Sequence, residues 1–402
     1  MRKRDYIPVL ALALLCVAMW FVPSAHPVVN DDGIPVRAKV VSVDDGDLAL
    51  TGMLEYGTQL LEVELLDGPA AGRRFGAENE IRAQLDLDKK FRPGDTAVVT
   101  WPEGGAKDGD TLVARDHWRL GWGMVLFGSF CLLLIVFGGW TGAKSLFSFV
   151  FSCFTVWKLV IPLCLDGWSA IWVTFVSVSV LTAVIMYLVA GCSRKGVTAF
   201  LGSMLGVGAS LVLARFFTAV MYVNGATMPF VQALLYSGYP ELDLADVFMG
   251  AVILASSGAL MDLAMDIAAG IDEVALHNPA LPRRALFMSG LRIGRSVVGT
   301  MTTTLLLAYS GGYLTLLMVF AAQGTPPLVF LNSTIVSAEV VKTLVGSFGL
   351  VLVAPFTAFV AAYLPSYGKG TERRRAVSSK KSLLEVPHFF GHENHRTPVN
   401  KG

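Results

Sequence analysis

The sequence predicts a mainly α-helical, polytopic membrane protein that carries a small β-barrel domain near its N-terminus. Of its 402 residues, 54% are apolar and only 16% are charged, whereas soluble domains average about 25% charged residues. Apolar runs of about 20 residues, the length that crosses ~30 Å of hydrocarbon, recur from residue 120 onward. Between residues 34 and 119 the pattern instead alternates with a period of two, which is typical of strands.

The composition also excludes several classes of protein. The formal net charge is +1 and the basic residues form short clusters, so we expect no nucleic-acid partner. None of the five cysteines falls within residues 28–118, so that stretch has no disulfide, and no Cys/His spacing indicates zinc. The HExxH, GxSxG and Walker motifs are absent, so we expect neither enzyme activity nor a cofactor; the sequence leaves any metal site unknown.

Residues 1–27 are expected to form a signal anchor and the first transmembrane helix. A basic start, MRKR, precedes an apolar run over residues 7–22. A cleaved signal peptide is the alternative, although Pro23, Ser24 and Ala25 match a cleavage site poorly. Both interpretations place the next segment outside the cytoplasm.

Residues 28–119 are predicted to form an extracytoplasmic, β-rich domain, a small barrel of the OB-like type (oligonucleotide/oligosaccharide-binding). Turn sequences separate five strand segments, which are VRAKVVSV, QLLEVELLDG, RRFGAENEI, DTAVVTWPE and LVARDHWR. The expected core contains Val36, Ala38, Val40, Leu61, Val63, Leu65 and Val98. The segment has no aromatic platform and no basic stripe, which favours a structural adaptor over a ligand-binding barrel.

Seven further spans are predicted to form the transmembrane domain over residues 120–366. The runs cover 120–140, 145–165, 168–190, 197–223, 245–268, 296–321 and a long last run that ends with 339–364. Lys and Arg fall in alternate loops, which places both termini in the cytoplasm and the barrel outside. Asp243 is expected to cap the helix that follows it, and residues 367–402 are expected to be a disordered cytoplasmic tail.

Two acids in the stretch GALMDLAMDIAAGIDEV are the first candidates for an ion- or substrate-binding site. At ~100° per residue, Asp262, Asp266 and Glu273 share one face of a helix. Counting from residue 245 places Asp262 near the inner edge of the hydrocarbon. The alternative is a cytoplasmic helix end, with the acids paired to Arg292 or Arg295 as structural ion-pair partners.

The second group of candidates lies in the last two runs. Gly311 and Gly312 are predicted to break a helix, and the run after Pro326 is too long for one upright span, which indicates an outer half-helix before it. Asn332 and Glu339 are seven residues apart and are expected to share a helix face as the outer counterpart of the two aspartates. Glu339 and Lys342 also have the spacing of a self-neutralising ion pair, which is the structural alternative.

Three segments carry a resemblance to a known family. GAVILASSGALMDLAMDIAAGIDEV, GRSVVGTMTTTLLLAYSGGYL and NSTIVSAEVVKTLVGSFGLVLVAPFTAFVAA follow a strand-rich domain and an anchor, and this order resembles the YibE/F family of bacterial multi-pass membrane proteins. The resemblance extends over nearly the whole chain to about Tyr363. It implies a bacterial cytoplasmic-membrane location and a permease-like architecture, but no substrate.

These observations favour a transporter or permease-like protein with an acidic polar site in the membrane domain. The expected partners are the lipid bilayer and a small solute or ion. The alternative is a non-transporting envelope sensor, scaffold or assembly factor, in which the barrel binds an extracytoplasmic protein.

Overall fold

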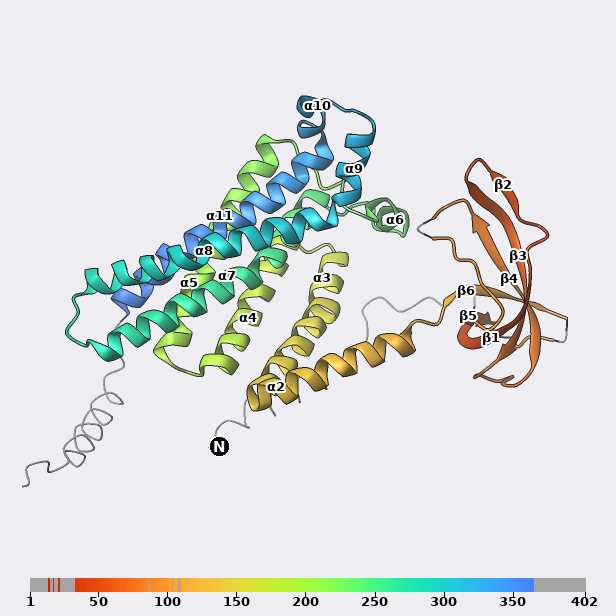
Figure 1. Ribbon diagram of the computed structural model, residues 1–402, viewed down its shortest axis with the longest axis horizontal. Coiled ribbons are helices and arrows are strands. Elements are labelled where there is room, and N and C mark those ends of the chain that lie inside the picture. Colours follow the sequence, from red (N-terminus) through yellow and green to blue (C-terminus); the bar gives the residue numbers. More distant parts are fainter. Residues whose placement is uncertain are drawn as a thin grey trace, which may run out of the picture. The chain divides into compact units, whose positions relative to one another are not determined.

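The computed structural model describes Leu14, Val17, Phe21 and residues 33–364, apart from residues 86, 103 and 108. The chain divides into two compact units, Met1–Phe151 and Ser152–Gly402. Figure 1 shows the strands in the first unit and most of the helices in the second. The predicted tail over residues 367–402 lies outside the described residues, as does the predicted anchor except for three of its residues.

The segment with period-two alternation, residues 34–117, forms a closed five-stranded barrel. Its strand order is β1-β5-β6-β4-β3, and β1 also pairs with β3, which closes the sheet; a short sixth strand, β2, extends β3. Among the described strands, β4 and β6 alone pair in parallel. The strands are β1 (Ile34–Asp44), β2 (Ala49–Thr51), β3 (Leu54–Leu65), β4 (Arg74–Arg82), β5 (Thr96–Trp101) and β6 (Thr111–His117). The five predicted strand segments are thereby confirmed.

Alternation along each strand fills the barrel interior. In β4 every second residue is buried, as the period of two requires. Six of the seven predicted core residues are buried, but Val98 is only half-buried. The prediction of Val98 was wrong by one position, because its neighbours Ala97 and Val99 point inward.

Two buried amides attach the β4–β5 connection to the barrel. Gln59 and Asn79 lie opposite each other on β3 and β4, and both are fully buried. Gln59 accepts a hydrogen bond from the Phe91 backbone NH at 2.9 Å, and Asn79 donates to the Lys89 carbonyl at 2.6 Å. These bonds fix the loop so that the Phe91 side chain enters the core.

A helical hairpin follows the barrel. Helix α2 (Leu120–Thr155) contains Gly139 in a non-helical conformation (φ 52°, ψ −129°), so two helices meet there. The Phe149 ring lies 6.3 Å from Phe127 and 6.5 Å from Phe130, which requires the chain to fold back after Gly139. The second arm continues through a π-helical turn, η2 (Val156–Val160), into α3 (Ile161–Leu165).

The second unit is built mainly from five long helices. They are α4 (Ala170–Ala190), α5 (Arg194–Val220), α7 (Leu244–His277), α8 (Arg283–Gly312) and α11 (Thr334–Tyr363). Shorter helices connect them, namely α6 (Val231–Tyr236), α9 (Leu314–Ala322) and α10 (Pro327–Leu331). Asp243 caps α7 by accepting hydrogen bonds from the Ala245 and Asp246 backbone NH groups, as predicted.

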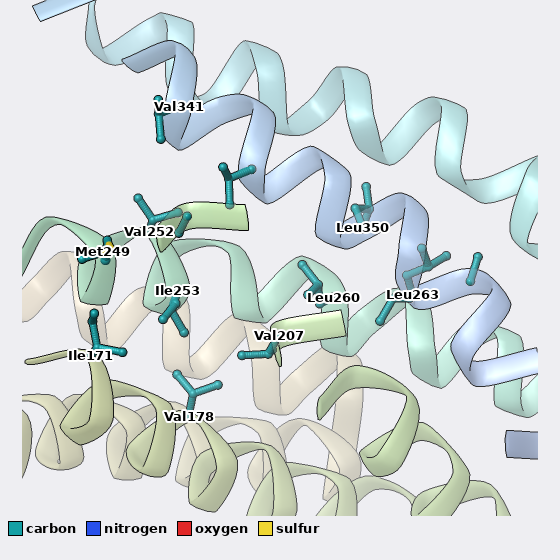
Figure 2. Close-up of a cluster of buried hydrophobic side chains, with 14 of the residues drawn as sticks. Ile171, Val178, Val207, Met249, Val252, Ile253, Leu260, Leu263, Val341 and Leu350 are labelled. Atoms are coloured by element: carbon teal, nitrogen blue, oxygen red, sulfur yellow. The ribbon is translucent and has the colours of Figure 1, made fainter. Parts of the chain in front are cut away.

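Helix α7 is the centre of this unit. Helices α4, α5, α11 and α8 all pack against it. Figure 2 shows side chains from α4, α5, α7 and α11 meeting in one apolar cluster around Met249, Ile253 and Leu260. All three of these side chains are fully buried.

Small residues let α5 and α11 approach closely. A Cβ atom on Gly202 would overlap Thr357, one on Gly206 would overlap Val353, and one on Gly349 would overlap Ser210. The small residues Gly202, Gly206 and Ser210 therefore form a helix–helix contact. The pairing also shows that α5 and α11 run antiparallel.

Five helical segments are long and apolar enough to cross a membrane, or six if the bent pair α8 and α9 counts as one. They are Leu120–Leu165, Ala170–Ala190, Arg194–Val220, Leu244–His277 and Thr334–Tyr363. The first has 46 residues and includes the break at Gly139. The predicted span over residues 296–321 falls within the bent pair, whose first helix already begins at Arg283.

We predict that Gly206→Ala destabilises the protein whereas Gly208→Ala does not. A methyl group at Gly206 would meet Val353 and Leu260, which are both fully buried, and such overpacking costs about 1–3 kcal/mol. A methyl group at Gly208 meets nothing within 4 Å, so Ala's higher helix propensity should stabilise it by up to ~1 kcal/mol. Thermal unfolding of the detergent-purified variants measures both changes. Equal melting temperatures would contradict the close packing of α5 and α11.

We also predict an acid-dependent contribution of Asp67 to the stability of the barrel. The Arg37 guanidinium donates to Asp67 at 2.6 Å, and this hydrogen bond lowers the pKa of the Asp67 carboxyl. A lowered carboxyl pKa stabilises the fold above the unfolded value of about 3.9, and the effect is lost as pH falls through the folded value. Both side chains are about two-fifths exposed, so solvent screening limits the effect to about 1 kcal/mol or less.

The test uses a fragment of residues 33–119, which we expect to unfold cooperatively on its own. Asp67→Asn should lower its urea midpoint at pH 7, and the difference from the wild type should disappear as pH falls through the lowered pKa of Asp67. Glu78→Gln is the control, because Glu78 is exposed and makes no hydrogen bond or ion pair with any described residue. A fragment without strand signal in circular dichroism would refute independent folding.

Candidate functional site

The sequence-predicted acids of α7 lie on its open face. Asp262, Asp266 and Glu273 are all exposed, and the helix runs without interruption to His277, so the three share one stripe as predicted. Asp272, by contrast, is half-buried. Ala251, Ala255 and Gly258 continue the same exposed stripe toward the start of α7.

This open face lies between α4 and α8. The helices that surround α7 pack against one another in the order α4, α5, α11, α8, and in the described part of the chain α4 and α8 do not pack together. The exposed small residues Ala251 and Ala255 also face this opening. On a helical wheel, Asp262 and Asp266 lie about 140° and about 100° from the buried Ile267, so both point into the same opening.

Helix packing places Asp262 well inside the length of the bundle. Leu260 lies against Gly206 of α5, which is twelve residues from Arg194 at the start of that helix. At ~1.5 Å per residue, Asp262 is about 15 Å along the axis from the level of Arg194, and Asp266 about 9 Å.

Neither arginine proposed as a structural partner neutralises these acids. Arg292 and Arg295 are exposed on α8 and form no ion pair with any described acid. Asp262 and Asp266 likewise have no hydrogen bond or ion pair among the described residues. Glu273 differs, because it pairs with His277 at 3.3 Å at the helix end.

A second polar group lies where α8 ends beside α11. The Glu339 carboxylate is 3.6 Å from the Lys342 ammonium on the next turn of α11, so the predicted ion pair forms. The Lys342 ammonium also lies 5.4 Å from the ring centroids of Tyr309 and Tyr313 on α8. Tyr313 and Glu339 also lie close together, since both line one pocket. We call these four residues the tyrosine–lysine cluster.

The tyrosine–lysine cluster is largely withdrawn from solvent. The side chain of Glu339 is only 18% exposed and that of Lys342 only 25%. Two of its atoms, Tyr309 Oη and Glu339 Oε2, are buried without a hydrogen-bond partner, although Oε2 is the oxygen that lies 3.6 Å from the Lys342 ammonium. Unsatisfied buried polar atoms are uncommon and costly, so this cluster is a strong candidate for binding a ligand.

A pocket of about 230 Å³ adjoins the cluster. Its walls are formed by aliphatic side chains and by the two tyrosines, with Glu339 also in the lining. The residues are Leu306, Tyr309, Ser310, Tyr313, Leu316, Leu317, Val336, Glu339, Val340, Thr343 and Leu344.

The bend between α8 and α9 forms one side of this pocket. Helix α8 ends at Gly312, and α9 leaves at 63° to it. The predicted helix break at Gly311 and Gly312 is therefore present, and it turns Leu316 and Leu317 of α9 toward the pocket. A short helix before the last long one was also predicted, and α10 occupies that place ahead of α11.

Asn332 does not belong to the cluster. Helix α11 begins after Ser333, which caps it, and Asn332 lies exposed in the preceding turn. The expectation that Asn332 and Glu339 share a helix face was wrong, because no continuous helix joins them. Tyr309 and Tyr313 were missed in the sequence; their four-residue spacing before a double glycine was the available signal.

The two polar groups are separated along the bundle. Gly346 of α11 packs against Ser256 of α7, which aligns Glu339 with about Met249. Thirteen residues then separate the level of Glu339 from Asp262, or about 20 Å along the axis. The molecule thus holds two separate polar groups, one level with the start of α7 and one at its middle and beyond, not one combined site.

Among the residues that the structure describes, no group of three or more His, Cys, Asp or Glu residues could hold a metal ion. The model of a protein family described as "YibE/F-like protein" matches residues 126–366, more than half of the chain. The match begins within α2, so it leaves out the barrel that the sequence resemblance had included. No curated protein and no solved structure matches the chain.

Proposed function

The chain belongs to the YibE/F-like family, and we propose that it is a transporter or permease-like protein of the bacterial cell membrane. One observation carries the proposal: a largely buried ion pair, Glu339 and Lys342, adjoins a 230 Å³ pocket at a helix break. Charged side chains inside a span are costly, and at broken helices they commonly mark solute or ion sites.

The two polar groups suit the two ends of a transport path. Glu339 is the binding residue of the outer site, and Asp262 and Asp266 form the inner one, about 20 Å away. Unpaired carboxylates between α4 and α8 attract cations or protons. The bend at Tyr313 supplies a hinge by which α9 can open or close the outer pocket.

Eight spans with both termini in the cytoplasm are part of this proposal. The hairpin that turns at Gly139 crosses twice, α4, α5, α7 and α11 cross once each, and the bent pair α8 and α9 crosses once. These seven crossings and the predicted anchor give eight. Arg194, Lys195, Arg283 and Arg284 gather at one end of the helices, which the positive-inside rule assigns to the cytoplasm.

The barrel is proposed to be an extracytoplasmic domain of the OB-like type. Its strand order, with a single parallel pair between β4 and β6, supports a partly Greek-key, five-stranded barrel of that type. The barrel lies outside the family match, so it is argued from this topology alone.

We predict that the barrel and the basic helix ends lie on opposite sides of the membrane. In a variant with its own cysteines replaced, a cysteine at Gly104 should react with an impermeant maleimide in intact cells, because Gly104 is exposed on the barrel. A cysteine at Arg284 should react only after the cells are opened. The reverse pattern would invert the topology.

We predict that neutralising the acids strongly reduces flux while leaving the fold intact. Reconstituted liposomes with imposed gradients of H⁺, Na⁺ or K⁺ should show a protein-dependent current. Glu339→Gln, Asp262→Asn or Asp266→Asn should each reduce it about tenfold or more, because each removes a charge from the path. Glu273→Gln is the matched control, since Glu273 pairs only with His277 at an exposed helix end.

A second candidate function is an envelope sensor, scaffold or assembly factor that binds an extracytoplasmic protein. Exposed apolar side chains at one end of the barrel favour it: Met53 is 93% exposed and Leu85 is 84% exposed, and both line a 310 Å³ pocket. If the three acid variants complement a deletion strain while Met53→Asp or removal of the barrel does not, this second function replaces the transporter.

A further inference from the structure

The tyrosine–lysine cluster has the composition of a cation-recognition site that the chain itself occupies. The Lys342 ammonium faces the rings of Tyr309 and Tyr313 and lies 3.6 Å from the Glu339 carboxylate. Aromatic ring faces with a nearby carboxylate are the groups that proteins use to bind ammonium ions. The Lys342 side chain therefore occupies the position in this site that a cationic ligand would take.

The adjoining pocket has the shape and lining for a hydrocarbon group. Of its eleven lining residues, six are aliphatic, and Glu339 is the only charged one. Its volume of about 230 Å³ is roughly that of eight water-sized groups at ~30 Å³ each. Tyr309 and Tyr313 both line it, so the same rings serve the cluster and the pocket.

The charges favour a cation over an anion. Lys342 is absent from the pocket lining, whereas Glu339 is part of it. An entering ligand thus meets a carboxylate and the negative faces of two rings. Tyr309 Oη and Glu339 Oε2, which have no hydrogen-bond partner, can each accept an N–H.

We propose that this site binds an alkylammonium ion, whose charged head competes with Lys342 for Glu339 and the tyrosine rings while its hydrocarbon part fills the pocket. An alkylammonium ion would be the substrate class of the outer site in the proposed transporter. Binding of this ion does not depend on the proposed function, whereas its transport does. The same chemistry occurs in a free aliphatic amine and in the amino head group of a phospholipid.

Calorimetric titration of the full-length protein in nanodiscs tests the proposal. The probe is 3-methylbutylamine, and 3-methylbutanol and 3-methylbutanoate are its neutral and anionic counterparts. The amine should bind, and the other two should bind about tenfold more weakly or not at all. Glu339→Gln should weaken amine binding about tenfold or more, because the ligand loses its charged hydrogen-bond acceptor.

Lys342→Met gives the most discriminating outcome. It removes the internal competitor, so amine affinity should rise about tenfold; a site for anions would instead lose affinity. Lys195→Met, at the far end of α5, is the matched lysine control and should leave binding unchanged. Tyr309→Leu keeps the ion pair and should weaken binding several-fold, which tests the site even if Lys342→Met does not fold.

The lipid composition of the nanodiscs distinguishes the two sources of the ammonium group. If the natural ligand is a lipid head group, nanodiscs rich in phosphatidylethanolamine should weaken apparent amine binding relative to pure phosphatidylglycerol. If it is a free amine, both nanodiscs should give the same affinity. Equal binding of amine and alcohol, or loss of affinity in Lys342→Met, would overturn the proposal. Amine binding without flux would reject only the transporter, and flux without amine binding only this inference.

Discussion

The close approach of α5 and α11 is the constraint on which the second unit depends. Glycines at 202, 206 and 349 leave no room for a Cβ atom between the two backbones. Helix α7 packs against both of these helices. Its Leu260 side chain contacts Gly206 of α5 and Gly349 of α11. The register of α7, and with it the position of Asp262, follows from this single three-helix contact.

The same constraint leaves α7 with one open side. Helices α4 and α8 complete the ring around it without packing together, so one face of α7 has no partner in the described part of the chain. That face carries small residues at one end and carboxylates at the other. An apolar side chain would be the simplest choice for a face turned to lipid, so the unpaired acids are explained better by a function than by stability.

Much of the fold follows from local patterns in the sequence, and the rest depends on contacts between distant residues. Period-two alternation predicts all five barrel strands, and the Gly311-Gly312 pair predicts the end of α8, because both effects act within a few residues. Val98 and Asn332 were misassigned where one bulge or one capping residue shifts the register. The tyrosines of the cluster belong to a different helix from Glu339, and a single sequence has no local signal for that pairing.

The surroundings of the Glu339–Lys342 ion pair favour a functional role for the pair over a purely structural one. A pair that served only to neutralise itself would be most stable at the surface, where Lys342 could extend into water and both charges would stay solvated. Here the ammonium is instead turned to two aromatic rings, and one carboxylate oxygen and one phenol oxygen stay buried without a hydrogen bond. Such an arrangement costs free energy in the absence of a ligand. The cost is understandable if the buried groups are held ready for a cation that satisfies them, and a helix break beside the pocket gives that cation a way in.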